Sequence, residues 1–347
     1  MAEFVPPFLL RNPHLMTIAA AFWWRRFPSL PAPAPRLFEV EPGTRILAEC
    51  HWQAEPRAHA TMLIVHGLEG SSRSGYMLGT AEKAFRAGFN VLRMNQRNCG
   101  GTENLTPSLY NSGLSGDVHA VIAELAQKDG LQQIFAAGFS MGGNLVLKMA
   151  GECGSAPPPE LRAVVAVSPS LDLAACADAV GRPQNFLYQR HFVNRLIKRM
   201  RHKARLFPQQ YPLDGLRRVR SVREFDDAIT ARFCGFRDAN DYYARSSARQ
   251  LLAAIRVPTL IVTAQDDPMI PFESFRDPAL TTNPQIQLEA PLHGGHCGFV
   301  ARSGTGERFW VEARIVEFCR AHLDSAAGRF PLENSAGQVA AQKPAGR

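Results

Sequence analysis

Short, mainly apolar runs alternate with longer amphipathic segments through the middle of the chain. The runs have the length and continuity of strands buried on both faces, and they occupy residues 62–65, 91–94, 134–137, 164–167, 260–262 and 286–288. Apolar residues at helical spacing fill segments 76–87, 114–128, 141–151 and 309–323. Strands that alternate with helices predict an α/β fold with a mostly parallel sheet covered on both faces.

Two further segments modify this simple alternation. Residues 36–53 contain two extended runs around a Glu-Pro-Gly turn, which predicts an antiparallel N-terminal hairpin at the edge of the sheet. About ninety residues separate Val167 from Leu260, which is too long for one connection. We therefore expect a helical cap inserted at about 175–252.

The two ends of the chain differ in composition from the predicted sheet domain, residues 36–323. Prolines break up residues 1–35, which predicts an arm with one short helix at Leu15–Trp24. Residues 324–347 are rich in Ala, Gly, Gln and Pro, and we expect a disordered tail there.

The overall composition is that of a large globular protein. Hydrophobic residues make up 46% of the 347 positions and charged residues 20%, which excludes a disordered chain. The seven cysteines are scattered without a Cys-x-x-Cys pair, which is typical of a reducing compartment. No signal-peptide pattern is present, and the longest apolar run is half the roughly 20 residues of a membrane span. We expect a soluble, cytoplasmic protein.

A candidate nucleophile follows the third predicted parallel strand. Gly138-Phe139-Ser140-Met141-Gly142 matches the pattern G-x-S-x-G at a junction between strand and helix, which is typical of the nucleophile turn of α/β-hydrolases. The small residues relieve backbone crowding at such a sharp turn. A glycine-rich turn that only packs tightly is the alternative interpretation.

A serine nucleophile needs a base and an acid, which follow in the order acid, then histidine, in this fold. The loop after the last strand carries His293 and His296, and His296 is the better base because a glycine pair precedes it. Two histidines can also bind a metal, but no third ligand is evident, so we predict no metal. Two adjacent carboxylates, Asp266 and Asp267, compete for the role of the acid.

An oxyanion hole needs two backbone N–H groups. Met141, directly after the nucleophile, and Leu68, in the loop after the first parallel strand, are the predicted donors. His66 precedes the first glycine of that loop, and we interpret it as a residue that orients the loop rather than as a base.

Several of these segments together resemble the AB hydrolase 4 family, the YheT-like α/β-hydrolases, over residues 8–323. The resemblance is carried by His66–Gly70, Gly138–Asn144, His293–Phe299, Arg11–Ile18 and a pattern from Asp226 to Asp267. It implies a serine carboxylic-ester hydrolase, with some members acting on lipid esters and some as acyltransferases. The acid turn of these hydrolases, Asp-x-x-Ile-Pro here, aligns on Asp267, with Asp266 as the alternative.

Positive charge is concentrated in the predicted cap. Residues 182–223 hold twelve Lys or Arg and one acidic residue, against a net charge of +8 for the chain. A basic amphipathic helix can contact an anionic membrane surface, or it can be a solvated face of the cap. The same alternatives hold for Leu15–Trp24 with Arg25 and Arg26, which can meet a bilayer interface or pack on the core. No stacking platform or motif for nucleic acid is present.

The sequence therefore predicts an ester hydrolase with Ser140, Asp267 and His296 as its triad and Leu68 and Met141 as oxyanion donors. The predicted substrates are small-molecule or lipid esters, and we predict that their hydrolysis needs no metal or cofactor. An alcohol O-acyltransferase with the same triad and a catalytically idle lipid-binding scaffold are the alternatives.

Overall fold

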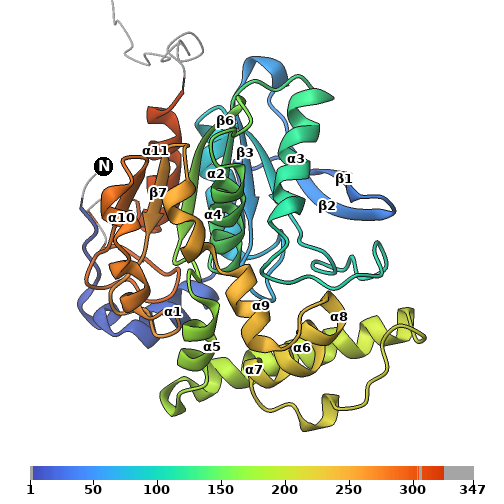
Figure 1. Cartoon of the computed structure of the whole chain (residues 1–347). Coiled ribbons are helices and arrows are strands. Elements are labelled where there is room, and N and C mark those ends of the chain that lie inside the picture. Colours follow the sequence, from blue (N-terminus) through green and yellow to red (C-terminus); the bar gives the residue numbers. More distant parts are fainter. Residues whose placement is uncertain (1–2, 303, 305–306, 324–347) are drawn as a thin grey trace, which may run out of the picture.

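A computed structural model describes residues 3–302, 304 and 307–323, and the predicted tail at 324–347 lies outside them. Eight strands form one sheet in the order β1-β2-β4-β3-β5-β6-β7-β8 (Figure 1). Their bounds are β1 Ala34–Glu41, β2 Thr44–His51, β3 Thr61–Val65, β4 Asn90–Met94, β5 Ile134–Phe139, β6 Leu161–Val167, β7 Thr259–Val262 and β8 Ile286–Glu289. β1 and β2 are antiparallel, and β3 to β8 are parallel to one another. The predicted fold class is confirmed.

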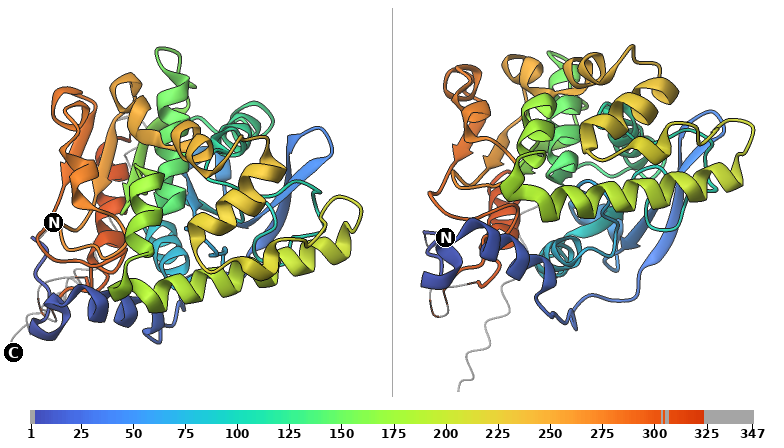
Figure 2. Two further views of the ribbon diagram at one scale, coloured as in Figure 1. Left: turned by 60° about the horizontal axis from the view of Figure 1, so that its bottom comes forward. Right: turned by 90° about the horizontal axis from the view of Figure 1, so that it is seen from below.

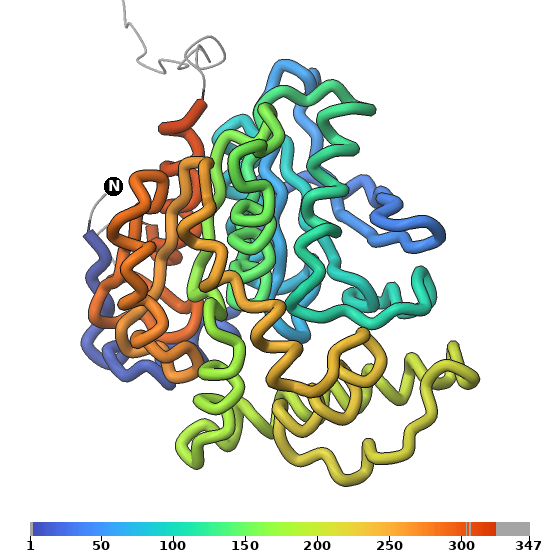
Figure 3. The backbone as a smooth tube through the Cα atoms, in the orientation of Figure 1, coloured from blue at the N-terminus to red at the C-terminus, as the bar shows by residue number. Residues whose placement is uncertain are grey.

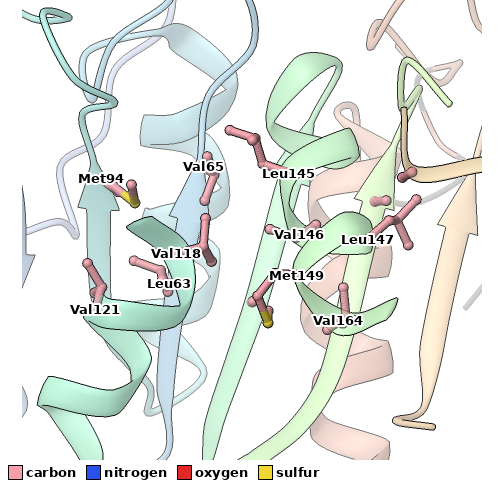
Figure 4. Close-up of a cluster of buried hydrophobic side chains, with 14 of the residues drawn as sticks. Leu63, Val65, Met94, Val118, Val121, Leu145, Val146, Leu147, Met149 and Val164 are labelled. Carbon is pink, nitrogen blue, oxygen red and sulfur yellow. The ribbon is translucent and has the colours of Figure 1, made fainter. Parts of the chain in front are cut away.

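Helices cover both faces of the sheet and bury its apolar strands. α3 (Ser115–Gln127) and α4 (Met141–Cys153) pack together on one face, and α2 (Gly75–Arg86) and α11 (Trp310–Ala321) pack together on the other. Figure 4 shows Val118 of α3 and Leu145 of α4 beside Leu63 and Val65 of β3. These strands alternate their side chains between two buried faces, which explains their continuous apolar sequence.

A set of helices is inserted between β6 and β7, and it lies below the sheet in the view of Figures 1 and 3. The helices are α5 Leu173–Val180, α6 Phe186–Leu206, α7 Val222–Phe225, α8 Arg232–Cys234 and α9 Ala239–Ser246, with a π-helical turn at Asp226–Ala231. The short α10 (Ala279–Thr282) packs on β8. The insertion places its helices over the carboxyl ends of the central strands, the edge at which open α/β sheets bind ligands.

A 3-10 turn at Phe8–Arg11 and one short α-helix, α1 at Pro13–Phe22, precede the sheet, and α1 lies two residues earlier than the predicted Leu15–Trp24. The Asn12 side chain accepts hydrogen bonds from the N–H groups of His14 and Leu15, so Asn12 caps the helix. Pro13 occupies the first helical position, where its missing N–H costs nothing. The local cap signal therefore outweighs the apolar run in setting where the helix begins.

Candidate active site

Ser140 lies on a sharp turn between β5 and α4, with φ 54° and ψ −119°. A backbone in this region is strained for a residue with a side chain, and it persists only where the surroundings fix it. The flanking glycines are required by contact: a Cβ on Gly138 would lie 2.1 Å from Gly142 O, and one on Gly142 would lie 2.4 Å from Val65 O. The turn therefore accepts no larger residue at either position.

The structure brings Ser140, His296 and Asp267 into one hydrogen-bonded line. His296 Nε2 lies 2.9 Å from Ser140 Oγ, and His296 Nδ1 lies 2.8 Å from Asp267 Oδ2. These residues come from the turn after β5, the loop after β8 and the loop after β7. The Asp267 side chain is fully buried, and that of His296 is 12% exposed. This arrangement can transfer the serine proton to the imidazole.

The surroundings of Asp267 set the tautomer of His296. Asp267 Oδ1 accepts hydrogen bonds from the N–H groups of Met269 and Ile270, which leaves Oδ2 to accept from His296 Nδ1–H. Nε2 is then free to accept a proton from Ser140. Burial lowers the pKa of His296, but the Asp267 carboxylate and the neighbouring Cys297 together raise it by more, so that this pKa lies well above 6.5.

Asp266, the alternative acid, does not form a hydrogen bond with His296 and instead forms hydrogen bonds with other residues of the same loop. Its Oδ2 is 3.1 Å from His293 Nδ1, and its Oδ1 accepts a hydrogen bond from the Gly295 N–H at 3.0 Å. Burial raises the pKa of Asp266. Asp266 therefore holds the loop that carries His296, whereas Asp267 contacts His296 itself.

Leu68, one predicted oxyanion donor, lies in the loop after β3 and lines the same pocket as Ser140 and Met141. This loop runs close to the nucleophile, because a Cβ on Gly67 would lie 3.0 Å from Ser140 Cβ. Tyr76 Oη accepts a hydrogen bond from the Gly67 N–H and holds the loop. The loop after β3 and the N-terminus of α4 thus both lie next to Ser140.

His66 is fully buried at the start of that loop. Its Nε2 accepts a hydrogen bond from the Gln96 N–H, which ties the loop to the end of β4. Burial lowers the pKa of His66 to about 4, so its imidazole is neutral at pH 7. The structure places it in contact with the loop backbone, as the interpretation of His66 as a loop-orienting residue requires.

A pocket of about 1030 Å³, counting its open mouth, extends from Ser140 and His296 beneath the inserted helices. Its walls are mostly apolar, with Leu173, Cys176 and Val180 from α5, Phe192, Leu196 and Met200 from α6, Val222 and Phe225 from α7, and Met269 and Ile270. The apolar stripe of the basic helix α6 therefore faces the pocket, not solvent. A pocket of this character suits an apolar chain.

Two polar residues of the pocket escaped the sequence analysis. Neither polar atom of the buried Asn98 side chain has a hydrogen-bond partner within the described residues, and the same is true of Ser170 Oγ. Asn98 follows β4 with φ 63°, in a segment whose sequence indicates only a turn. Buried polar groups are normally paired, so these atoms are available to a ligand.

The basic residues of α6 do not all face solvent. Arg199 donates two hydrogen bonds to the Glu69 carboxylate, at 2.8 and 3.1 Å, and Tyr110 donates to the same carboxylate. Lys203 is fully buried and donates to the carbonyls of Glu103 and Thr106. Burial lowers the pKa of Lys203 to about 8. These two cations fasten α6 over the pocket.

α1 supports the loop that carries His296. Thr17 Oγ1 accepts a hydrogen bond from the His296 N–H at 2.9 Å, and Met16 is buried beside Gly298. A Cβ on Gly295 would lie 2.7 Å from Pro13 O, so the loop packs against the helix backbone. The predicted arm thus packs against the loop that carries His296.

Comparison with known proteins gives consistent matches. Residues 60–302 match the family model described as alpha/beta hydrolase fold. The chain is similar to "Putative esterase YheT" of Escherichia coli, with 32% identity over 93% of this chain and 95% of that protein. It is also similar to phospholipase ABHD3 of Mus musculus, with 31% identity over 76% of this chain and 64% of that protein. The Pyrococcus furiosus esterase Pf2001 superposes with a TM-score of 0.59 at 14% identity, over 93% of this chain and 98% of that one.

Proposed function

Because the chain belongs to the alpha/beta hydrolase fold family, we propose that it is a serine hydrolase that cleaves carboxylic esters. The observation that carries the proposal is the line of hydrogen bonds from Ser140 through His296 to Asp267. Among the described residues that line this pocket, no other serine or cysteine is hydrogen-bonded to a histidine. The relatives named as an esterase and a phospholipase support ester chemistry at the level of reaction class.

In the proposed first step Ser140 Oγ attacks the ester carbonyl carbon while His296 Nε2 takes the serine proton. The carbonyl π electrons move to oxygen, and the backbone N–H groups of Leu68 and Met141 hold the resulting oxyanion. Asp267 stabilises the imidazolium that forms, without itself taking the proton. Collapse of the tetrahedral species breaks the bond to the alcohol oxygen, which leaves with the proton from His296.

In the second step a water molecule repeats the attack on the acyl-serine. His296 takes a proton from water as the new carbon–oxygen bond forms, and it returns this proton to Ser140 Oγ as the acyl–serine bond breaks. The carboxylic acid then leaves. Water serves as the acceptor in this proposal, and an alcohol in its place would give the acyltransferase reaction.

The apolar pocket supports an ester of a fatty acid as the substrate. Its walls from α5, α6 and α7 give an acyl chain contact on several sides, and burial of apolar surface favours chain binding by about 0.8 kcal/mol per CH₂. We propose short- to medium-chain acyl esters or lipid esters as the class. The unpaired Asn98 amide offers hydrogen bonds to the polar part of such an ester.

The test is hydrolysis of p-nitrophenyl esters from acetate to palmitate by the wild type, Ser140→Ala and the matched control Ser170→Ala. Ser170 lines the same pocket without a hydrogen-bond partner for its hydroxyl among the described residues. Ser140→Ala should lower kcat by about 10⁴-fold or more, with an unchanged Tm. Ser170→Ala should keep kcat within about tenfold of the wild type.

A fluorophosphonate provides a second readout because it labels an activated serine covalently. Label should appear on Ser140 in the wild type and in Ser170→Ala, and it should be absent from Ser140→Ala. An active Ser140→Ala protein, or label on another residue, would overturn the proposal. Activity that appears only when an alcohol acceptor is added would favour the acyltransferase.

A further inference from the structure

The outer face of α1 is apolar, which is unusual for a helix on the surface of a protein. Its ten residues include no Asp, Glu, Lys or Arg. Met16 and Thr17 are buried, whereas Leu15, Ile18 and Phe22, at spacings of three and four, share one exposed face. Surface helices normally turn polar side chains outward, so the exposed face of α1 has the character of a contact surface.

Exposed apolar side chains are concentrated around α1 and the start of α6. Of the fourteen large apolar side chains exposed among the described residues, eight lie between Val5 and Trp24 and two are Phe186 and Leu187. Phe22 is 81% exposed, Trp24 73% and Leu187 70%. Apolar patches of this kind mark interaction sites on soluble proteins.

The two segments lie side by side although about 170 residues separate them. His14 of α1 stacks on Tyr188 of α6, with ring centroids 5.7 Å apart and 15° between the planes. His14 Nδ1 also lies 3.2 Å from Tyr188 Oη. Both views of Figure 2 show α1, in blue, next to the start of α6, in lime green. We call this surface, residues 8–26 with 182–190, the α1–α6 face.

The charge of the α1–α6 face has one sign. Residues 4–38 and 179–213 contain no Asp or Glu. Arg11, Arg26, Arg182 and Arg190 are exposed, and none of them has an ion-pair partner among the described residues. The Arg26 guanidinium lies 4.5 Å from the centre of the Trp24 ring. Aromatic side chains flanked by free cations complement a surface that is apolar inside and anionic outside.

The face adjoins the candidate active site through both of its segments. α1 accepts the hydrogen bond from the His296 N–H, and α6 continues from Leu187 to Phe192, which lines the pocket. The face therefore shares α6 with the pocket of Ser140, and it shares α1 with the support of the His296 loop.

We propose that the α1–α6 face docks the protein on the interface of a phospholipid bilayer that contains anionic lipids. Phe8, Leu9, Phe22, Trp24, Phe186 and Leu187 enter the headgroup region, and the four free arginines meet the anionic headgroups. The docking is peripheral, since no helix within the described residues is long and apolar enough to cross a membrane. Binding itself does not depend on the proposed hydrolysis, but the delivery of an ester from the bilayer to Ser140 rests on it.

A bilayer fits these observations better than a second copy of the chain does. A second copy would bring the same four arginines against each other, because a two-fold interface pairs a surface with itself. Neither segment of the face contains a carboxylate to neutralise them. An anionic lipid surface supplies the negative charge that neutralises them. The strength of the binding increases with the number of cations near the headgroups.

The test measures co-sedimentation of the full chain with vesicles of phosphatidylcholine alone and of phosphatidylcholine with phosphatidylglycerol. The variants are Phe22→Ser/Trp24→Ser and Phe186→Ser/Leu187→Ser, which remove exposed apolar contacts from each segment. The matched control is Leu206→Ser/Leu213→Ser, which changes two exposed leucines at and just after the C-terminal end of α6. Arg182→Gln/Arg190→Gln tests the charge.

The wild type and the control should bind the anionic vesicles, and each apolar double variant should weaken this binding by about tenfold or more. Arg182→Gln/Arg190→Gln should reduce the preference for phosphatidylglycerol. All variants should hydrolyse a soluble p-nitrophenyl ester at the wild-type rate, while the two apolar variants lose activity on an ester held in vesicles.

Three results would overturn the docking proposal. They are a wild type that does not bind anionic vesicles, apolar variants that bind as well as the control, and a wild-type dimer that Phe22→Ser/Trp24→Ser converts to monomer in light scattering. A wild type that binds vesicles through this face but hydrolyses no ester would instead overturn the proposed function and leave the docking surface standing.

Discussion

The Thr17 hydroxyl accepts a hydrogen bond from the backbone N–H of His296 at 2.9 Å, although 279 positions separate the two residues. Thr17 Oγ1 itself donates to the Pro13 carbonyl within α1. The hydroxyl therefore joins a helix before the sheet to the loop that carries the candidate base. A residue that precedes the sheet thus helps to fix the position of His296.

Thr17→Val should lower kcat with little change in KM for a soluble ester. Valine keeps the shape of threonine but leaves the part-buried His296 N–H without its acceptor, which costs about 1–3 kcal/mol. The loop can respond by moving the imidazole, and we expect kcat to fall by about tenfold. Thr17→Ser should restore the rate. Thr281→Val, which alters a similar helical hydroxyl on the remote α10, is the control and should match the wild type.

Asn substitutions at Asp267 and Asp266 should separate the two carboxylates by magnitude. Asp267→Asn places an amide against His296 Nδ1 and favours the wrong tautomer, so kcat should fall by about 10⁴-fold. Asp266→Asn keeps an oxygen for the Gly295 N–H and changes only the contact with His293. A loss of about tenfold or less is expected there. A larger loss of kcat in Asp266→Asn than in Asp267→Asn would show that Asp266, and not Asp267, is the acid of the triad.

The dependence of kcat/KM on pH should report the titration of His296. Its pKa lies well above 6.5 because the charge and hydrogen bond of Asp267, together with the neighbouring Cys297, raise it by more than burial lowers it. The neutral imidazole is the active form, so kcat/KM should fall as the pH decreases through that pKa. Removal of the raising charge in Asp267→Asn should move this acidic limb to lower pH. A limb that moves upward, or stays in place, would show that another group controls the profile.

The fold and the candidate triad could be predicted because their signals are local. Apolar runs such as Met62–Val65 identify buried strands, and the glycines around Ser140 identify the turn that needs them. The structure adds what local patterns do not contain. No sequence pattern links Thr17 to His296 or His14 to Tyr188, since these contacts depend on how distant segments pack.

Even for two adjacent carboxylates, the sequence alone does not predict which contacts each side chain makes. Asp266 and Asp267 are adjacent and chemically identical, and only the direction of each side chain in the folded loop assigns one to His293 and the other to His296. The sequence did not single out Asn98. Its side chain stands out because it is buried without a hydrogen-bond partner among the described residues, and a sequence does not show which hydrogen bonds a residue lacks. α1 begins two residues before the predicted helix because Asn12 and Pro13 set its start.

Asn98→Gly should lower kcat/KM but leave the free energy of unfolding almost unchanged. Glycine accepts the positive φ at this position and retains the backbone carbonyl that Arg199 contacts. Loss of the side chain removes two buried polar atoms that have no partner among the described residues, which offsets the roughly 0.5–1 kcal/mol that glycine costs in chain entropy. If the amide binds the ester, kcat/KM should fall by about tenfold, the value of one hydrogen bond of about 1.4 kcal/mol. Calorimetry and ester kinetics on the same preparation give both quantities, and an unchanged kcat/KM would place Asn98 outside the substrate's reach.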